Sequence, residues 1–131
     1  MTEDNKRVVR GYFDSVASAD GKALDWLSDD VVWWVPQGSS LRGTHRGKAA
    51  VVELMERGVG AYSTEVPMEI EVRRLVAEDD WVCAQVEIRA AARNGAPYVN
   101  QYHFAFRVRD GRIAEVNEYV DTRYVYETLG L

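Results

Sequence analysis

Apolar residues recur at helical spacing along the first half of the chain. The clearest case is a helix predicted over residues 2–19, with an apolar face made of Val8, Val9, Tyr12, Phe13 and Val16. A short helix is predicted over residues 22–27 and another over residues 47–59. Between them, a β-prone run predicts a strand over residues 31–35, and residues 37–46 are predicted to form a loop.

Apolar and polar residues alternate in the second half, which is typical of β-strands. Four long strands are predicted over residues 66–77, 81–93, 98–109 and 112–120, joined by turns such as Asp110-Gly111. A last helical segment is predicted to reach Leu129, with Asp121 as its N-terminal cap. This order predicts an α+β fold with three helices packed on a curved antiparallel sheet.

Size and charge narrow the classes of function. The chain has 131 residues, so residues 1–131 are expected to form a single domain. Its net charge is −5, with no basic stripe, so nucleic acid is not an expected partner. No apolar run reaches the roughly 18 residues of a membrane span, and the polar N-terminus lacks an export signal. We therefore expect no membrane association and a cytoplasmic location.

Metal and thiol chemistry are not expected. Cys83 is the only cysteine, lies in an apolar run, and is interpreted as a small buried side chain. His45 and His103 are far from it in sequence, and the three residues lack the spacing of metal ligands. No glycine-rich phosphate loop is present either, so we expect no cofactor.

Two segments carry a resemblance to a known superfamily. Residues 29–36 read DDVVWWVP, and residues 110–121 run from DGRI to EYVD. Together with the element order, they resemble the nuclear transport factor two-like fold, over essentially the whole chain. The chain is most similar to the SnoaL-like branch, which includes polyketide cyclases, limonene-epoxide hydrolase and ketosteroid isomerase. The resemblance implies a cone-shaped α+β barrel with one deep apolar pocket, and a homodimer formed through the outer face of the sheet.

The strand predicted over residues 81–93 has one apolar and one polar face. The apolar face consists of Val82, Ala84, Val86, Ile88 and Ala90. The polar face consists of Gln85, Glu87 and Arg89. The alternation alone predicts that the valines face the core and the polar residues face solvent. The resemblance instead implies that the polar residues face the pocket and that the valines pack against a second subunit. We adopt the orientation implied by the resemblance as the expectation.

Glu118 is the first candidate for catalysis. It stands where the cyclases and the epoxide hydrolase have a catalytic aspartate. A carboxylate that projects into an apolar cone has a raised pKa, as a general acid or base requires. The alternative is a structural pair with an arginine at the rim of the barrel. Asp121, three residues further on, falls on the opposite face of the strand.

Further candidates come from the relay of the epoxide hydrolase, in which an arginine lies between two carboxylates. Glu87 fits the first acid and Glu118 the second, but Gln85 occupies the arginine position. Gln85 can donate to one carboxylate, and Arg89 could supply the missing positive charge. The alternative is that Glu87 and Arg89 form a structural pair.

The comparison with ketosteroid isomerase is less favourable. Tyr12 matches the tyrosine that donates to the oxyanion, but Val35 replaces the base aspartate and Tyr102 replaces the protonated aspartate. We therefore do not expect a steroid isomerase, and Tyr12 could be an ordinary core aromatic.

Alternation predicts the wall of the pocket. The wall consists of Trp33, Val35, Asn100, Tyr102, Phe104, Phe106, Val116, Glu118 and Val120, with Tyr12 and Arg89 as further candidates for substrate binding. Trp34 and His103 are expected to point outward, and His45 to lie in a solvated loop. Each wall residue could equally be plain core, but Asn100 and Tyr102 favour a pocket because packed cores contain few amides and hydroxyls.

Three functions are compatible with these observations. The first is a cofactor-independent acid–base enzyme of the cyclase, isomerase or epoxide-hydrolase type, acting on a small hydrophobic substrate that carries oxygen. The second is a non-catalytic protein that binds a small molecule in the same cone. The third is a dimerisation module whose cone is filled by its own side chains.

Overall fold

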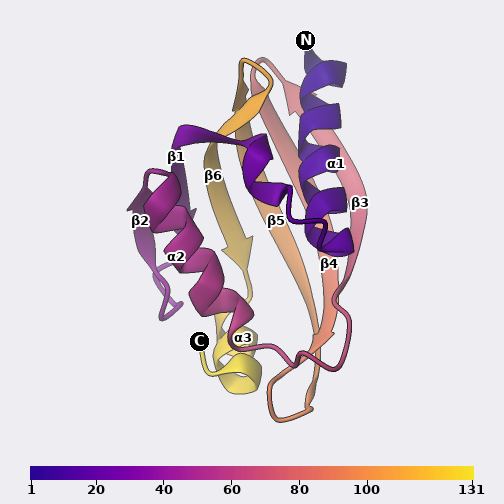
Figure 1. The fold of residues 1–131 in the computed structure, drawn as a ribbon, viewed down its shortest axis with the longest axis vertical. Helices are drawn as coiled ribbons and strands as arrows, with labels where there is room; N and C mark the ends of the chain where they lie inside the picture. The colour runs from indigo at the N-terminus through magenta and orange to yellow at the C-terminus, as the bar shows by residue number, and fades with distance from the viewer.

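Three α-helices lie on one face of a curled six-stranded sheet in the computed structural model, which describes residues 1–131 (Figure 1). The helices are α1 (Thr2–Ser18), α2 (Lys48–Val59) and α3 (Thr122–Leu129). The strands are β1 (Leu27–Val35), β2 (Gly43–Arg46), β3 (Glu69–Glu78), β4 (Trp81–Ala91), β5 (Pro97–Arg109) and β6 (Arg112–Val120). This arrangement confirms the predicted α+β class.

The sheet has the strand order β2-β1-β6-β5-β4-β3. Neighbouring strands are antiparallel except for β1 and β6, which are parallel. The edge strands β2 and β3 do not pair with each other, so the sheet forms an open cone and not a closed barrel. None of the helices combines the length and the apolar character that a membrane span requires.

The turn between β5 and β6 shows how local sequence sets the topology. Asp110 and Gly111 both have positive φ angles, 53° and 76°. A two-residue turn of this kind matches the right-handed twist of paired strands, and Asp-Gly is one of its preferred sequences. The turn therefore fixes β5 and β6 as an antiparallel hairpin.

The core lies between α1 and the sheet. Val8, Val9, Tyr12 and Phe13 of α1 are buried, as the helical pattern predicts. The ring of Phe13 packs against Phe104 and Phe106 of β5 at centroid distances of 5.5 and 5.6 Å. Burial of such side chains is the main force that holds the helix on the sheet.

The structure differs from the prediction in the segment before α2. The helix predicted over residues 22–27 is a single 3₁₀ turn, η1 (Ala23–Trp26), and β1 begins at Leu27. The loop predicted over residues 37–46 ends in β2, which pairs with β1 at the edge of the sheet. These polar residues form a strand because of pairing with a neighbour, which apolar periodicity does not reveal.

The orientation expected for β4 is wrong. Val82, Ala84 and Val86 face the core and are at most 1% exposed, whereas Gln85, Glu87 and Arg89 lie on the outer face of the sheet. The inner face of β4 packs beneath α1, next to the aromatic face of β5. Apolar side chains are stabilised there, and charged groups would lose their hydration. Alternation alone therefore predicts the correct face.

Candidate functional site

A cavity of about 200 Å³ lies inside the cone, between the inner face of the sheet and helices α2 and α3. Sixteen of its nineteen lining residues are apolar, and Glu118 is the only charged residue among them. Of the predicted wall, the cavity is lined by Trp33, Val35, Tyr102, Phe104, Glu118 and Val120. A carboxyl group in such surroundings has few water molecules or dipoles to stabilise its charge.

Tyr12, Asn100, Phe106 and Val116 were also predicted to line the pocket, but they lie behind its wall. All four are buried, and none is among the residues that line the cavity. The ring of Tyr12 packs against Trp33 at a centroid distance of 6.3 Å. Burial raises the pKa of the Tyr12 hydroxyl, and the nearby Glu118 carboxylate adds to the effect. Tyr12 thus belongs to the aromatic core that supports the wall.

Glu118 projects inward from β6, where alternation with Val116 and Val120 places it. Its backbone lies opposite Phe104 of β5. Its Oε1 accepts a hydrogen bond of 3.1 Å from the indole Nε1 of Trp33. Burial raises the pKa of Glu118 to about 7, and the hydrogen bond from Trp33 opposes this rise. No arginine or lysine forms an ion pair with Glu118.

A cluster of hydroxyl groups lies beside this carboxyl group. The hydroxyls of Tyr98 and Tyr102 are 2.5 Å apart, and the Asn100 amide donates a hydrogen bond of 3.0 Å to Tyr98. Tyr62 packs edge-on against Tyr98 and lines the cavity. Burial raises the pKa of each of these tyrosines, so all three keep their protons at neutral pH.

Tyr62, Tyr98 and the C-terminal part of the wall were not predicted from the sequence. Tyr98 alternates with Asn100 and Tyr102, so the same rule could have found it. Tyr62 lies outside any periodic segment, in the connection after α2. The C-terminal contribution comes from Val125, Leu129 and Leu131. Their place at the cavity depends on how α3 folds back, which no pattern in the sequence indicates.

The end of the chain is held against the cavity by two polar contacts. Asp121 accepts a hydrogen bond of 3.2 Å from the backbone N–H of Tyr124, so it caps α3 as predicted. The backbone N–H of Ser40 donates a hydrogen bond of 2.6 Å to the carbonyl oxygen of Leu131. These contacts fix α3 beside the loop that contains Ser39 and Leu41, which also line the cavity.

Residues 9–116 match the family described as the SnoaL-like domain. The chain belongs to this family. The match covers β1, β4, β5 and most of the cavity wall, although it ends just before Glu118. No curated protein matches the chain.

Solved structures share the fold of this SnoaL-like domain at low sequence identity. TerC, crystallised with polyporic acid, is 19% identical with a TM-score of 0.85, covering 98% of this chain and 99% of its own. An NTF2-like protein of unknown function from Burkholderia pseudomallei is 21% identical with a TM-score of 0.84, and 98% of each chain is covered. AclR, a putative hydroxylase from Streptomyces galilaeus, is 20% identical with a TM-score of 0.78, covering 99% of this chain and 87% of its own. At these identities the similarity establishes the fold alone.

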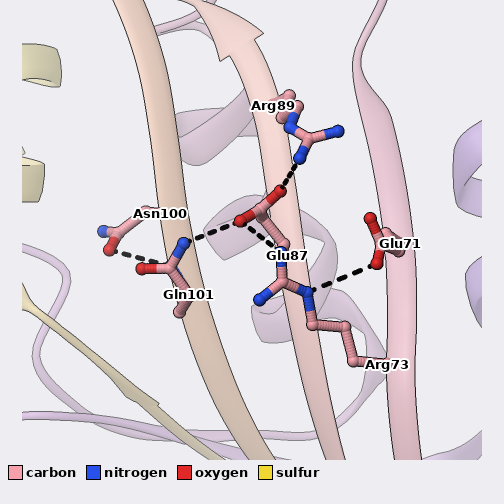
Figure 2. A network of polar contacts seen from close by, with 6 residues as sticks. All are labelled: Glu71, Arg73, Glu87, Arg89, Asn100 and Gln101. Carbon is pink, nitrogen blue, oxygen red and sulfur yellow. Dashed lines mark hydrogen bonds and ion pairs between the residues drawn. The ribbon is translucent and has the colours of Figure 1, made fainter.

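The second predicted carboxylate of this SnoaL-like domain lies outside the cone. Figure 2 shows Glu87 on the outer face of the sheet, where dashed lines join it to the side chains of Arg73, Arg89 and Gln101. Its Oε1 accepts hydrogen bonds from Arg73 (2.7 Å) and Gln101 (2.8 Å), and its Oε2 contacts the guanidinium of Arg89. Arg73 also pairs with Glu71 at 3.3 Å. Glu87 and Arg89 therefore form a structural pair, and the carboxylate–carboxylate relay expected in the pocket is absent.

Gln85 and the two histidines do not line the cavity. Gln85 accepts a hydrogen bond of 3.0 Å from Arg74 on the exposed face of the sheet. His45 donates through Nε2 to the carbonyl oxygen of Leu41 at 2.8 Å. His103 is exposed on the outer face, opposite Gln85. The structure contains no group of three or more His, Cys, Asp or Glu side chains placed to hold a metal ion.

Proposed function

We propose that this SnoaL-like domain is a cofactor-independent acid–base enzyme that acts on a small hydrophobic substrate carrying oxygen. One observation carries the proposal: Glu118 is the only charged residue of an apolar cavity, and burial raises its pKa to about 7. A carboxyl group with this pKa is present in both protonation states at neutral pH. It can therefore accept a proton in one step and return it in the next.

Several reactions need such a group. As a base, the Glu118 carboxylate would remove a proton from carbon beside a carbonyl group, or from a water molecule that attacks an epoxide. As an acid, it would protonate a developing alkoxide. Trp33 would hold the carboxyl group through its indole N–H while the proton moves. Cyclisation by aldol chemistry, isomerisation, dehydration and epoxide hydration all contain one of these steps.

The architecture supports a small-molecule substrate. The cavity is apolar, with hydroxyl and carboxyl groups at a few positions, as is usual for ligand pockets. TerC, which is similar in fold, was crystallised with the small molecule polyporic acid. The catalytic candidates Glu87 and Gln85 are not retained, because both lie on the outer face of the sheet.

The test compares Glu118→Gln with the wild-type protein on two probe reactions: deuterium exchange into the methyl group of acetophenone, and hydrolysis of styrene oxide. We expect Glu118→Gln to lower the rate about 10²- to 10⁴-fold. Glu115→Gln is the matched control, because Glu115 is on the same strand, opposite Arg107 and outside the cavity. Equal rates in the wild-type and Glu118→Gln proteins, or no turnover of either probe, would reject the proposal for these reaction types.

The pH dependence identifies the role of Glu118. If the carboxylate is the base, kcat/KM rises as the pH increases through about 7, the pKa of Glu118. If the carboxylic acid is the donor, kcat/KM falls over the same range. A profile without an inflection near this pH would contradict both roles.

A second candidate is a protein that binds the same ligands without chemistry. It is favoured by the absence of a second charged group in the cavity, since Glu87 is held outside by arginines. Stabilisation of the fold by acetophenone and styrene oxide, with no product from either, would select this function. A filled dimerisation module is not favoured, because the cone retains a cavity of about 200 Å³.

We also propose that the domain is cytoplasmic and forms a homodimer through the outer face of the sheet. That face carries exposed apolar side chains on three strands: Val76 of β3, Val99 of β5 and Tyr119 of β6. The partner would meet this mixed polar and apolar face and not the valine face of β4, which is in the core. Sedimentation analysis that finds a monomer at micromolar concentration would reject the dimer.

A further inference from the structure

A chain of hydrogen bonds leads from the strand β5 into the cavity. It begins at the backbone N–H of Gln101, which donates to Oδ1 of Asn100 at 3.0 Å. Nδ2 of Asn100 donates to the hydroxyl of Tyr98 at 3.0 Å, and that hydroxyl lies 2.5 Å from the hydroxyl of Tyr102. Asn100 and Tyr98 lie behind the wall, while Tyr102 lines the cavity.

The direction of the first two bonds is fixed by chemistry. A backbone N–H only donates, so the atom of Asn100 that faces Gln101 must be the carbonyl oxygen. The opposite side of the amide is therefore the NH₂ group, and it only donates. Tyr98 consequently accepts a hydrogen bond from Asn100, whichever way its own hydrogen points.

The direction in which the Tyr98 hydroxyl donates then determines whether the Tyr102 hydroxyl accepts or donates in this pair. Tyr98 is fully buried, with 0% exposure, so its hydroxyl hydrogen needs an acceptor inside the protein. The oxygen of Tyr102, at 2.5 Å, is the acceptor that it meets. If Tyr102 donated instead, the buried hydrogen of Tyr98 would be left without this partner, which is unfavourable. Tyr102 therefore accepts from Tyr98, and its own hydrogen points to the cavity side. There the hydroxyl of Tyr62 can accept it, and a ligand oxygen would take the place of Tyr62.

We propose that Asn100 is a positioning residue that orders this chain, so that the Tyr102 hydroxyl donates a hydrogen bond to a carbonyl oxygen of a one-ring ligand. The inference rests on the proposed function, because it assigns a ligand class to the same cavity. A chain of hydrogen bonds strengthens its last donor by polarisation, so Tyr102 is a better donor than an isolated phenol. The oxygen that it binds gains negative charge when a neighbouring atom loses a proton.

The cavity sets the size of this ligand. A protein cavity of about 150 Å³ can hold a benzene molecule, and the cavity here has about 200 Å³. Tyr102 is diagonal to Glu118 across the β5–β6 pair, because Phe104 is the direct partner of Glu118. A ring with one carbonyl group could therefore contact the Tyr102 hydroxyl and the Glu118 carboxyl group at the same time.

The test compares two ligands. The first is benzaldehyde with a ¹³C-labelled carbonyl group, and the second is styrene, which has a CH₂ group in place of the carbonyl oxygen. All proteins carry Glu118→Gln, which removes the titration of that group and leaves the binding question independent of turnover. Benzaldehyde has no proton on carbon beside the carbonyl, so it reports binding only. We expect Tyr102→Phe to weaken benzaldehyde binding roughly two- to tenfold and to raise its carbonyl stretching frequency, with styrene binding unchanged.

A second variant tests the role of Asn100. In Asn100→Asp, the introduced carboxyl group donates to Tyr98 when it is protonated and accepts from Tyr98 when it is ionised. In the ionised form Tyr98 no longer donates to Tyr102, so Tyr102 donates to Tyr98 and its hydrogen no longer points into the cavity. The carbonyl frequency of benzaldehyde should then rise toward the Tyr102→Phe value as the introduced group ionises. Ionisation is followed through the carboxylate bands of the same spectra. With Asn100 retained, the frequency should not depend on pH.

Three results would overturn the inference. The first is failure of benzaldehyde to bind when Asn100 and Tyr102 are both retained. The second is an equal loss of benzaldehyde and styrene binding in Tyr102→Phe, which would mean that Tyr102 only packs. The third is a carbonyl frequency in Asn100→Asp that equals that of the parent at every pH. None of these results depends on whether Glu118 catalyses a reaction, so the inference and the proposed function can fail separately.

Discussion

The indole Nε1 of Trp33 donates a hydrogen bond to Oε1 of Glu118 across 85 positions of sequence. The two residues meet because β1 and β6 are parallel neighbours, with Trp33 opposite Val116. The bond acts against burial: it stabilises the charged carboxylate, whereas the apolar cavity disfavours it. The balance between these two effects leaves Glu118 able to titrate near neutral pH.

Removal of the indole donor should shift this balance. In Trp33→Phe the carboxylate loses its hydrogen bond, so we expect the pKa of Glu118 to rise above about 7. The pKa can be measured by NMR titration of the labelled glutamate carboxyl carbon. Trp34→Phe is the matched control, because Trp34 packs against Tyr119 on the outer face of the sheet. A fall in the pKa in Trp33→Phe would contradict the assigned role of the bond.

Glu118 should make the protein less stable at high pH. The folded-state pKa is about 7 and the ordinary value is 4.5, so between these pH values the folded protein holds a proton that the unfolded chain has released. The contribution of Glu118 is most favourable below about pH 4.5 and declines until about pH 7. Glu118→Gln should remove this dependence and raise the unfolding free energy at pH 8 by up to about 3 kcal/mol.

Denaturant unfolding of wild-type and Glu118→Gln proteins at pH 4 and pH 8 measures this effect. The two proteins should differ little at pH 4, because Glu118 is then protonated in both states. Glu115→Gln should follow the wild-type protein at both pH values. A wild-type protein more stable than Glu118→Gln at pH 8 would mean that the carboxylate is well solvated.

Glu87 should matter for stability and not for chemistry. Glu87→Gln removes the charge that Arg73 and Arg89 share, and we expect a loss of about 1–3 kcal/mol in unfolding free energy. Rates on acetophenone or styrene oxide should not change. Gln85→Ala, on the same face and exposed, should alter stability by less than about 0.5 kcal/mol. A large loss of rate in Glu87→Gln, with the unfolding free energy unchanged, would mean that Glu87 takes part in catalysis.

The cap of α3 should influence both stability and ligand binding. Asp121→Ala removes the acceptor for the Tyr124 N–H, at a cost of about 1 kcal/mol. Because Val125 and Leu129 of α3 line the cavity, benzaldehyde affinity should fall as well. Asp121→Asn retains an acceptor and should stay close to the wild-type protein in both measurements. Loss of stability without loss of affinity would show that the cavity does not depend on α3.

Strand periodicity explains how much of this site the sequence could predict. The inward position of Glu118 follows from alternation with Val116 and Val120, and the apolar wall of β5 follows from the same rule. The sequence could predict that the pKa of Glu118 is raised, but not its value, because the value depends on the cavity and on the hydrogen bond from Trp33. Tyr62 and Leu131 could not be predicted, since both reach the cavity from segments without periodicity.

The error at β4 has a physical origin. Both faces of this strand contain buried residues, because Arg73, Arg89 and Gln101 cover Glu87 on the outside and leave it 5% exposed. A charged residue in a strand is therefore not proof of an inward or an outward face. The alternation of valines was the better guide, since an unbroken apolar face is what a helix can cover.

The parallel pairing of β1 with β6 also has a consequence for biosynthesis. A ribosome releases Trp33 long before it has made Glu118, and the two strands join only when almost the whole chain is available. Until then the carboxyl group is hydrated and acidic, like that of any free glutamate. In a nascent or truncated chain Glu118 thus cannot serve as an acid or base at neutral pH, and the raised pKa of this one carboxyl group reports whether synthesis and folding are complete.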